Sequence, residues 1–502
     1  MLDDLPVPPK DWPQKPAGIS LCMIVRDEED FLGDALASVE GAVDEICIVD
    51  TGSTDRTIAI ARAAGAEVRE LAWEDDFSKA RNAALAMATR RWILVLDADE
   101  ALAAEARPVL AALRERPAQL TGLWIRCNNL TDDYKGTGAM SNAIVRVFPN
   151  HERIRYRNVI HEFVALDGDL AGVPAILSGI EIFHRGYLQD VIRQRKKAER
   201  NLALAKAALD KEPHDPFHWY NYATSAFIGK DVDEAIFALE RMRTLNAGRS
   251  QGFMPAALGM LADLYLNERQ NSLRAEVIAR EALERAPTFA NAHFTLGKAL
   301  AAQQRFAEAR EAFVSAIDDG KHTHEHFYVD DEVPRWKAHS EIGGTLMEEG
   351  GFELALAWFD FALQVRPKLQ PVRLNRARAL EQLGRFEEAE SVLKEVWEDD
   401  RDAFAANEYL NYLLRRGRDA DALAFIGGVA EGLPPDTQVI LYGSAATLAA
   451  RGSEGLDQAE RYLEQALAVR GVLHHRERLT ALFKHFGSPL MLALLERGSP
   501  TL

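Results

Sequence analysis

The first third of the chain carries three short apolar runs with little polar alternation. They are residues 19–25, 45–49 and 92–96. Such runs are typical of strands that are buried on both faces of a parallel sheet. Amphipathic stretches that favour helices lie near or between them, at residues 31–39, 55–64 and 77–89. This alternation predicts βαβ units, in which ligands bind at the carboxyl ends of the strands.

After about residue 190 the strand signals stop and amphipathic helices follow one another. One unit recurs, in which a glycine is followed by Ala, Phe and Ala at offsets of 12, 16 and 19 residues. Its two copies are Gly297, Ala309, Phe313 and Ala316, and Gly343, Ala355, Phe359 and Ala362. The small residues let two antiparallel helices approach closely, and the phenylalanine fills the groove between repeats. This pattern is that of tetratricopeptide repeats, with about 34 residues per unit.

The small residue of the second helix marks seven such units. These residues are Ala235, Ala275, Ala309, Ala355, Ala389, Ala422 and Ala459. The longest interval, 46 residues from Ala309 to Ala355, indicates an insertion. We therefore predict an N-terminal extension, an α/β domain, a connecting helix and an all-α solenoid. Their predicted bounds are 1–17, 18–189, 190–211 and 212–490.

Composition narrows the range of functions. The 502 residues include 59 Lys and Arg against 77 Asp and Glu, a formal net charge of −18. Binding to the phosphate backbone of a nucleic acid needs clustered basic residues, so we expect no nucleic-acid partner. No apolar run approaches the ~20 residues that span a bilayer, so we expect no membrane insertion. The three cysteines lie in or beside apolar runs, which favours a reducing, cytoplasmic location.

Three predicted strands end in charged residues. Arg26 and Glu28 follow the first strand, Asp50 ends the second, and Asp97 and Asp99 follow the third. Crowded carboxylates need a cation or hydrogen-bond donors to hold them together. Mg²⁺ and Mn²⁺ take oxygen ligands and commonly bridge to substrate phosphates. The pattern predicts a divalent-cation site, although ordinary capping carboxylates at strand-to-helix turns are the alternative.

Four segments together carry a family resemblance: MIVRDEEDFL, VDEICIVDTGSTDRT, DDFSKARNAAL and WILVLDADE. Over about residues 18–187 the chain resembles glycosyltransferase family 2, the inverting enzymes of the GT-A fold. It is similar to their bacterial branch with appended tetratricopeptide repeats, the S-glycosyltransferases of glycocin peptides. The resemblance implies a GT-A, Rossmann-like nucleotide-sugar-binding domain ahead of the solenoid.

The resemblance also implies roles for the strand-end residues. Asp50 would hold the base or ribose of the donor nucleotide, Asp97 would contact the ribose, and Asp99 would bind the metal. Arg26 and Glu28 would line the nucleotide pocket.

The segment that contains Lys79 and Arg81 would face the donor. A guanidinium suits a phosphate or a uracil edge, although a solvated helix arginine is the alternative for Arg81.

Two further motifs of this branch occur as His161-Glu162 and as His184 followed by Arg-Gly-Tyr. An inverting transfer needs a base for the acceptor proton, and Glu162 is the first candidate. Asp133 is the second, in a Gly-rich segment at 131–138 beside another aspartate. His184 suits a further metal ligand, since neutral imidazole coordinates metals. A core histidine bonded to the backbone is the alternative for either His.

These features predict an inverting, Mn- or Mg-dependent transferase. It would move a hexose or N-acetylhexosamine from a UDP-sugar donor to a peptide, protein or glycan acceptor. We expect the repeats to position the acceptor, or to mediate self-association as a homo-oligomer, and to do no chemistry. A polysaccharide- or lipid-directed transferase of the same family is one alternative. A non-catalytic scaffold with a degenerate transferase domain is another.

Overall fold

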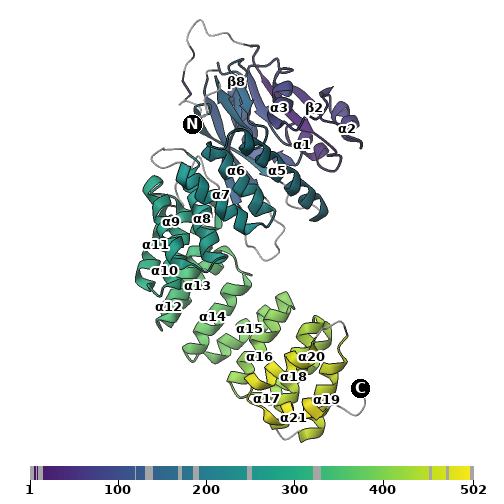
Figure 1. Cartoon of the computed structure of the whole chain (residues 1–502), viewed down its shortest axis with the longest axis vertical. Coiled ribbons are helices and arrows are strands. Elements are labelled where there is room, and N and C mark those ends of the chain that lie inside the picture. The colour runs from purple at the N-terminus through teal and green to yellow at the C-terminus, as the bar shows by residue number, and fades with distance from the viewer. Residues whose placement is uncertain are drawn as a thin grey trace. The chain divides into compact units, whose positions relative to one another are not determined.

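The computed structural model describes residues 5–6, 8, 15–118, 120–129, 140–167, 172–184, 191–245, 252–319, 329–451, 455–470 and 474–497. Internal contacts divide the chain into two units, 1–345 and 346–502. The predicted fold class is confirmed, because an α/β domain with a mixed sheet is followed by paired helices of tetratricopeptide type (Figure 1).

Four parallel strands form the first half of the sheet. They are β1 (Ile19–Val25), β2 (Glu45–Asp50), β3 (Glu67–Glu70) and β4 (Trp92–Val95). Their order is β3-β2-β1-β4, so β1 and β4 are neighbours across the switch in strand order. The register pairs Val25 with Asp50 and Ile19 with Trp92. The carboxyl ends of these strands therefore meet at one edge of the sheet.

Both faces of this half are covered, which is why its strands read as unbroken apolar runs. Leu21 and Met23 of β1 belong to one core cluster, and Cys22 between them belongs to a second. Residues of three helices join the first cluster: α1 (Leu32–Ser38), α2 (Thr57–Ala63) and α4 (Arg107–Arg114). Helix α3 (Phe77–Leu85) covers the other face.

The second half of the sheet is largely antiparallel. Its strands are β5 (Glu100–Leu102), β6 (Gly122–Asn129), β7 (Met140–Pro149) and β10 (Ala175–His184). The order continues β4-β7-β6-β10-β5, and β7 runs antiparallel to both β4 and β6. A separate hairpin consists of β8 (Ile154–Arg157) and β9 (Phe163–Leu166). A short 3₁₀ turn, Ala104–Ala106, precedes α4.

Helix α5 (Val191–Lys211) occupies the segment where a connecting helix is predicted. Three helix pairs follow in the first unit. They are α6 (Pro216–Ile228) with α7 (Val232–Leu245), α8 (Met254–Asn267) with α9 (Ser272–Arg285), and α10 (Ala290–Ala302) with α11 (Phe306–Asp319). A short strand, β11 (Val329–Asp330), and a π-helical turn, Val333–Lys337, then lead into α12 (Ala338–Glu348).

The second unit is helical throughout its described residues. Its helices are α13 (Phe352–Val365), α14 (Gln370–Gln382), α15 (Phe386–Asp400), α16 (Ala403–Arg415), α17 (Asp419–Val429), a 3₁₀ turn (Ala430–Gly432), α18 (Pro435–Arg451), α19 (Gly455–Ala468), α20 (His475–His485) and α21 (Pro489–Arg497). None of the helices within the described ranges is long and apolar enough to cross a membrane.

The small residues that mark the repeats are packed as their pattern requires. All seven marker alanines lie in second helices and are 0% exposed. A Cβ added to Gly297 in α10 would lie 2.5 Å from the ring of Phe313 in α11, which is itself fully buried. The two helices therefore approach as closely as they do because position 297 lacks a side chain.

Candidate active site at the carboxyl edge of the sheet

Asp50 anchors the turn that follows β2. Its Oδ1 accepts hydrogen bonds from the backbone N–H groups of Gly52 and Ser53, each at 2.9 Å. Gly52 has φ 106°, a conformation that glycine adopts at little cost. Asp50 is 1% exposed, and its Oδ2 is buried without a hydrogen-bond partner in the described part of the chain. A buried oxygen of this kind is a candidate acceptor for a ligand's N–H or O–H.

The turns after β1 and β2 are bonded to each other. The backbone N–H of Asp27 donates to Ser53 Oγ at 2.9 Å, and that of Glu28 donates to Thr57 Oγ1 at 2.8 Å. Glu28 is half-buried at this turn, whereas the side chain of Arg26 is 54% exposed. These bonds bring the predicted residues of strands one and two to the same edge of the sheet.

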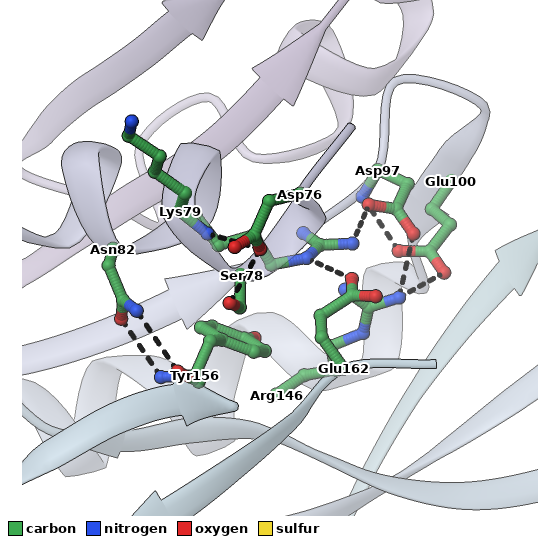
Figure 2. Close-up of polar contacts among 10 residues, drawn as sticks. Asp76, Ser78, Lys79, Asn82, Asp97, Glu100, Arg146, Tyr156 and Glu162 are labelled. Carbon is green, nitrogen blue, oxygen red and sulfur yellow. Dashed lines mark hydrogen bonds and ion pairs between the residues drawn. The ribbon is translucent and has the colours of Figure 1, made fainter. Parts of the chain in front are cut away.

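Asp97, just beyond β4, lies at the centre of a network of five charged side chains (Figure 2). Its Oδ1 accepts from Arg81 Nη2 at 2.7 Å, and its Oδ2 accepts from Arg146 Nη2 at 2.8 Å. Arg81 Nε also donates to Glu162 Oε1 at 2.5 Å. Arg146 Nη2 also donates to Glu100 Oε1 at 3.1 Å. Arg81 therefore bridges Asp97 and Glu162, the candidate base.

Burial and ion pairing act on these groups in opposite directions. Burial alone would raise the pKa of Asp97, but the guanidinium groups of Arg146 and Arg81 outweigh it and hold this pKa well below its usual range. Burial raises the pKa of Glu100, although Arg146 opposes the shift. The guanidinium groups of Arg81 and Arg146 thus supply positive charge and hydrogen-bond donors to all three carboxylates of the network.

Asp99 and His184 form a second group at the same edge. His184 ends β10 and pairs in register with Glu100 of β5. Its Nε2 lies 3.2 Å from Asp99 Oδ2, and the side chains are 20% and 13% exposed. Burial would lower the pKa of His184, but the hydrogen bond to Asp99 and the surrounding carboxylates raise it.

This pair fits a divalent cation in its donor chemistry and spacing. An octahedral cation with ligand distances of about 2.1 Å holds neighbouring ligand atoms about 3.0 Å apart. The 3.2 Å between the two side-chain atoms is close to that value, and it is also the length of a hydrogen bond, so the spacing suits either arrangement. A carboxylate and an imidazole would leave further positions for water and substrate oxygens.

Two predicted site residues lie apart from this constellation or outside the described residues. Lys79 Nζ is paired with Glu74, and Figure 2 shows its ammonium pointing away from Asp97. Asp133 lies outside the described residues.

Sequence reasoning missed Arg146 and Tyr156. Arg146 occurs within the apolar run Ile-Val-Arg-Val-Phe at 144–148, and an arginine so placed signals a buried carboxylate partner. Tyr156 is 4% exposed, and the guanidinium of Arg81 lies 5.3 Å from its ring centre. Asn82 holds this strand, since its amide bonds both the N–H and the C=O of Tyr156, at 2.9 and 3.0 Å.

Two parts of the chain match known protein families. Residues 20–172 match the family described as Glycosyl transferase family 2. The N-terminal region is a glycosyl transferase family 2 domain. Residues 346–414 match the family described as Tetratricopeptide repeat, so the predicted resemblance is confirmed for both parts.

Two relatives and one solved structure match parts of the chain. A TPR repeat-containing protein of Synechococcus elongatus is 39% identical over 209 residues, which are 40% of this chain and 50% of that protein. The SPbeta prophage-derived glycosyltransferase SunS of Bacillus subtilis is 24% identical over 225 residues, 44% of this chain and 52% of SunS. The chain thus spans about half the length of these two relatives. A tetratricopeptide repeat protein from Parabacteroides merdae superposes with a TM-score of 0.39 and 16% identity, covering 54% of this chain and 97% of that one.

Proposed function

We propose that this protein is an inverting glycosyltransferase. It moves a sugar, a hexose or an N-acetylhexosamine, from a UDP-sugar to a peptide, protein or glycan acceptor. The observation that carries the proposal is the meeting of Asp50, the Asp97 network and the Asp99–His184 pair at the carboxyl edge of a family 2 sheet. Ligands of open α/β sheets bind at this edge.

The donor nucleotide is assigned to the turns after β1 and β2. Asp50 Oδ2 lacks a partner among the described residues, and an N–H of the base or a hydroxyl of the ribose would supply one. Asp97 is assigned to the ribose. Arg26, Glu28 and Lys79 are assigned to the rim of the pocket.

Asp99 and His184 are assigned to a divalent cation, Mn²⁺ or Mg²⁺. When bound, such an ion neutralises the negative charge of the donor diphosphate as that group leaves. Both side chains are mostly buried, so their ligand atoms are held in place before substrate arrives.

Glu162 is assigned as the base. It takes the proton from the acceptor while the acceptor atom bonds to the anomeric carbon, and the bond from that carbon to the diphosphate oxygen breaks, releasing UDP. Glu162 Oε1 accepts from Arg81, and the side chain is 13% exposed. Asp133 is the alternative base. The repeats are assigned to acceptor positioning or self-association.

A UDP-release assay tests the proposal. The full chain is incubated with UDP-glucose, UDP-galactose and UDP-N-acetylglucosamine, with Mn²⁺, with Mg²⁺ or with EDTA. We expect release from at least one donor with metal and none with EDTA. Absence of release and of UDP binding by calorimetry with every donor would contradict the proposal.

Asp50→Ala addresses the donor pocket in the same calorimetry. Loss of a charge-assisted hydrogen bond should weaken UDP binding by about 1–3 kcal/mol. Thr51→Val serves as the neighbouring control, because the hydroxyl of Thr51 donates to the backbone carbonyl of Val25 inside the protein. Equal UDP affinity in Asp50→Ala and the wild type would move the nucleotide site elsewhere.

A further inference from the structure

The insertion between the third and fourth repeats adds a strand to the catalytic sheet. Strand β11 lies in the 46-residue interval between Ala309 and Ala355 and pairs antiparallel with β7. Val329 pairs with Ser141, and Asp330 pairs with Met140. A segment of the repeat array is therefore part of the sheet that carries the candidate active site.

Strand β11 pairs with the part of β7 that β4 does not reach. Strand β4 pairs with β7 at Val147–Pro149, and β4 then ends at Val95, just before Asp97. Strand β11 pairs with the opposite end of β7 on the side away from β6. Strand β7 is thus held at both ends, and Arg146 lies between the two pairings. At about 3.4 Å per residue, Arg146 is about 17 Å along the strand from Ser141.

An ion pair reinforces the strand pairing. Arg126 Nη2 of β6 donates to Asp331 Oδ1 at 2.8 Å, and the side chains are 41% and 22% exposed. The contact joins residues that are 205 positions apart in the chain. Strands β6 and β7 are paired along their length, so a contact to either one constrains both.

The inserted segment is in turn fastened to the repeats. The N–H of Asp330 donates to Asn291 Oδ1 of α10 at 3.2 Å. Asp330 Oδ1 accepts from the N–H of Glu332, and its Oδ2 accepts from Lys337 Nζ at 2.5 Å. The same carboxylate therefore fixes β11 against the turn that begins α12.

A second contact joins the repeats to the site from another direction. Phe163, which follows Glu162 in the chain, packs edge-on against Phe217 of α6 with ring centres 6.1 Å apart. Phe217 packs in the same way on Phe253, at 5.2 Å. The repeats thus contact the strand that carries Arg146, at its far end, and the residue that follows Glu162.

We propose that Asp331 is a positioning residue for donor binding. Through Arg126 and the β11–β7 pairing it holds β7, and β7 holds Arg146 against Asp97 and Glu100. The inference rests on the proposed function in assigning Asp97 to the donor. It makes the first three repeats and their insertion part of the catalytic unit, so that the repeats set the donor site as well as any acceptor site.

The test uses three variants of the full chain. Asp331→Lys reverses the charge, Asp331→Glu keeps it, and Glu281→Lys reverses a matched ion pair within the repeats. Glu281 pairs with Arg243 at 2.6 Å, with side chains 19% and 27% exposed, between α9 and α7, and it also pairs with Arg285 of its own helix at 3.2 Å. The rate of backbone amide hydrogen exchange in peptides within 140–149 measures how firmly β7 is held in the sheet. UDP release measures KM and kcat for the donor that the wild type uses.

For Asp331→Lys we expect exchange in 140–146 to accelerate and donor KM to rise, each by about two- to tenfold, because an ion pair of this exposure is modest. We expect kcat to change less than KM, and Asp331→Glu to behave as the wild type. Glu281→Lys should leave both readings unchanged. Unchanged exchange in Asp331→Lys, or equal changes in Asp331→Lys and Glu281→Lys, would overturn the inference. If the wild type releases no UDP, the proposed function fails while the exchange data still decide the hold on β7.

Discussion

The carboxyl edge of the sheet and the repeat helices differ in how deeply most of their paired charges are buried. At the sheet edge, Arg81 and Arg146 are 8% and 13% exposed, and each bridges two carboxylates. In the repeats many charges pair near the surface, as in Arg385 with Glu388 at 2.6 Å, where the side chains are 44% and 54% exposed. Arg373 is an exception, since it is 8% exposed and pairs with Asp399. Buried charges are costly unless fully paired, so their concentration at one edge marks the place where chemistry is expected. The repeats bury small residues together with large apolar side chains such as Phe313 and Phe359.

The largest expected effect concerns the Asp99–His184 pair, where a substitution should lower activity without unfolding the protein. Asp99→Ala should lower turnover by at least about 100-fold, as expected when a group that stabilises developing charge is lost. The residue lies after a strand end, so circular dichroism and the melting temperature should stay close to those of the wild type. Wild-type turnover in this variant, or in excess EDTA, would remove the metal from the mechanism.

The next effect separates the two candidate bases. Glu162→Gln keeps the shape of the side chain and removes its basicity, so the chemical step should slow by about 10²–10⁴-fold. Donor binding, measured by calorimetry, should be preserved, because the amide oxygen can still accept from Arg81. Asp133→Asn is the matched variant. The assignment is reversed if Asp133→Asn gives the slow phenotype and Glu162→Gln does not.

Two arginine variants compare the stability that is lost when a buried and an exposed ion pair are removed. Arg146→Met leaves Asp97 with one guanidinium fewer and Glu100 without its charged partner, and should destabilise the catalytic sheet by about 3–5 kcal/mol. Arg385→Met removes the ion pair with Glu388, in which the side chains are 44% and 54% exposed, and should cost at most about 1 kcal/mol. Hydrogen exchange of β4 and of α15 reports the two local stabilities. Similar losses in both variants would show that burial does not separate the two regions.

The smallest effect tests close packing in the repeats with two glycines. Gly297→Ala places a Cβ 2.5 Å from the buried ring of Phe313 and should destabilise by about 1–3 kcal/mol. A Cβ at Gly344, within α12, meets nothing within 4 Å. Gly344→Ala should therefore stabilise by about 0.5–1 kcal/mol through helix propensity. Thermal unfolding should move in opposite directions for the two variants.

Much of the fold can be predicted from the local pattern of apolar and polar residues in the sequence. Strands β1, β2 and β4 are buried on both faces, so their apolar runs identify them without knowledge of their neighbours. The repeats are predictable because each unit repeats its neighbour's spacing. The predicted strand-end residues Asp50, Asp97 and Asp99 do lie at one sheet edge, because parallel strands bring their carboxyl ends together.

Other parts of the site depend on contacts that no local pattern encodes. Arg146 meets Asp97 only because β7 runs antiparallel beside β4, a pairing across 49 residues. Glu162 meets Arg81 across 81 residues. Strand β11 is two residues long and pairs with a strand nearly 190 residues earlier, so the insertion could be detected from its length but its place in the sheet could not.

The strand supplied by the repeats also determines where this protein can be cut and recombined. A chimera that exchanges everything after residue 211 would discard β11, Asp331 and Phe217 together with the helices, and so would remove parts of the catalytic sheet's support. A junction after Val365, at the end of α13, keeps all three and leaves α12 and α13 uncut. We therefore expect that repeats beyond that point can be added, removed or replaced while the α/β domain retains the segment that completes its sheet.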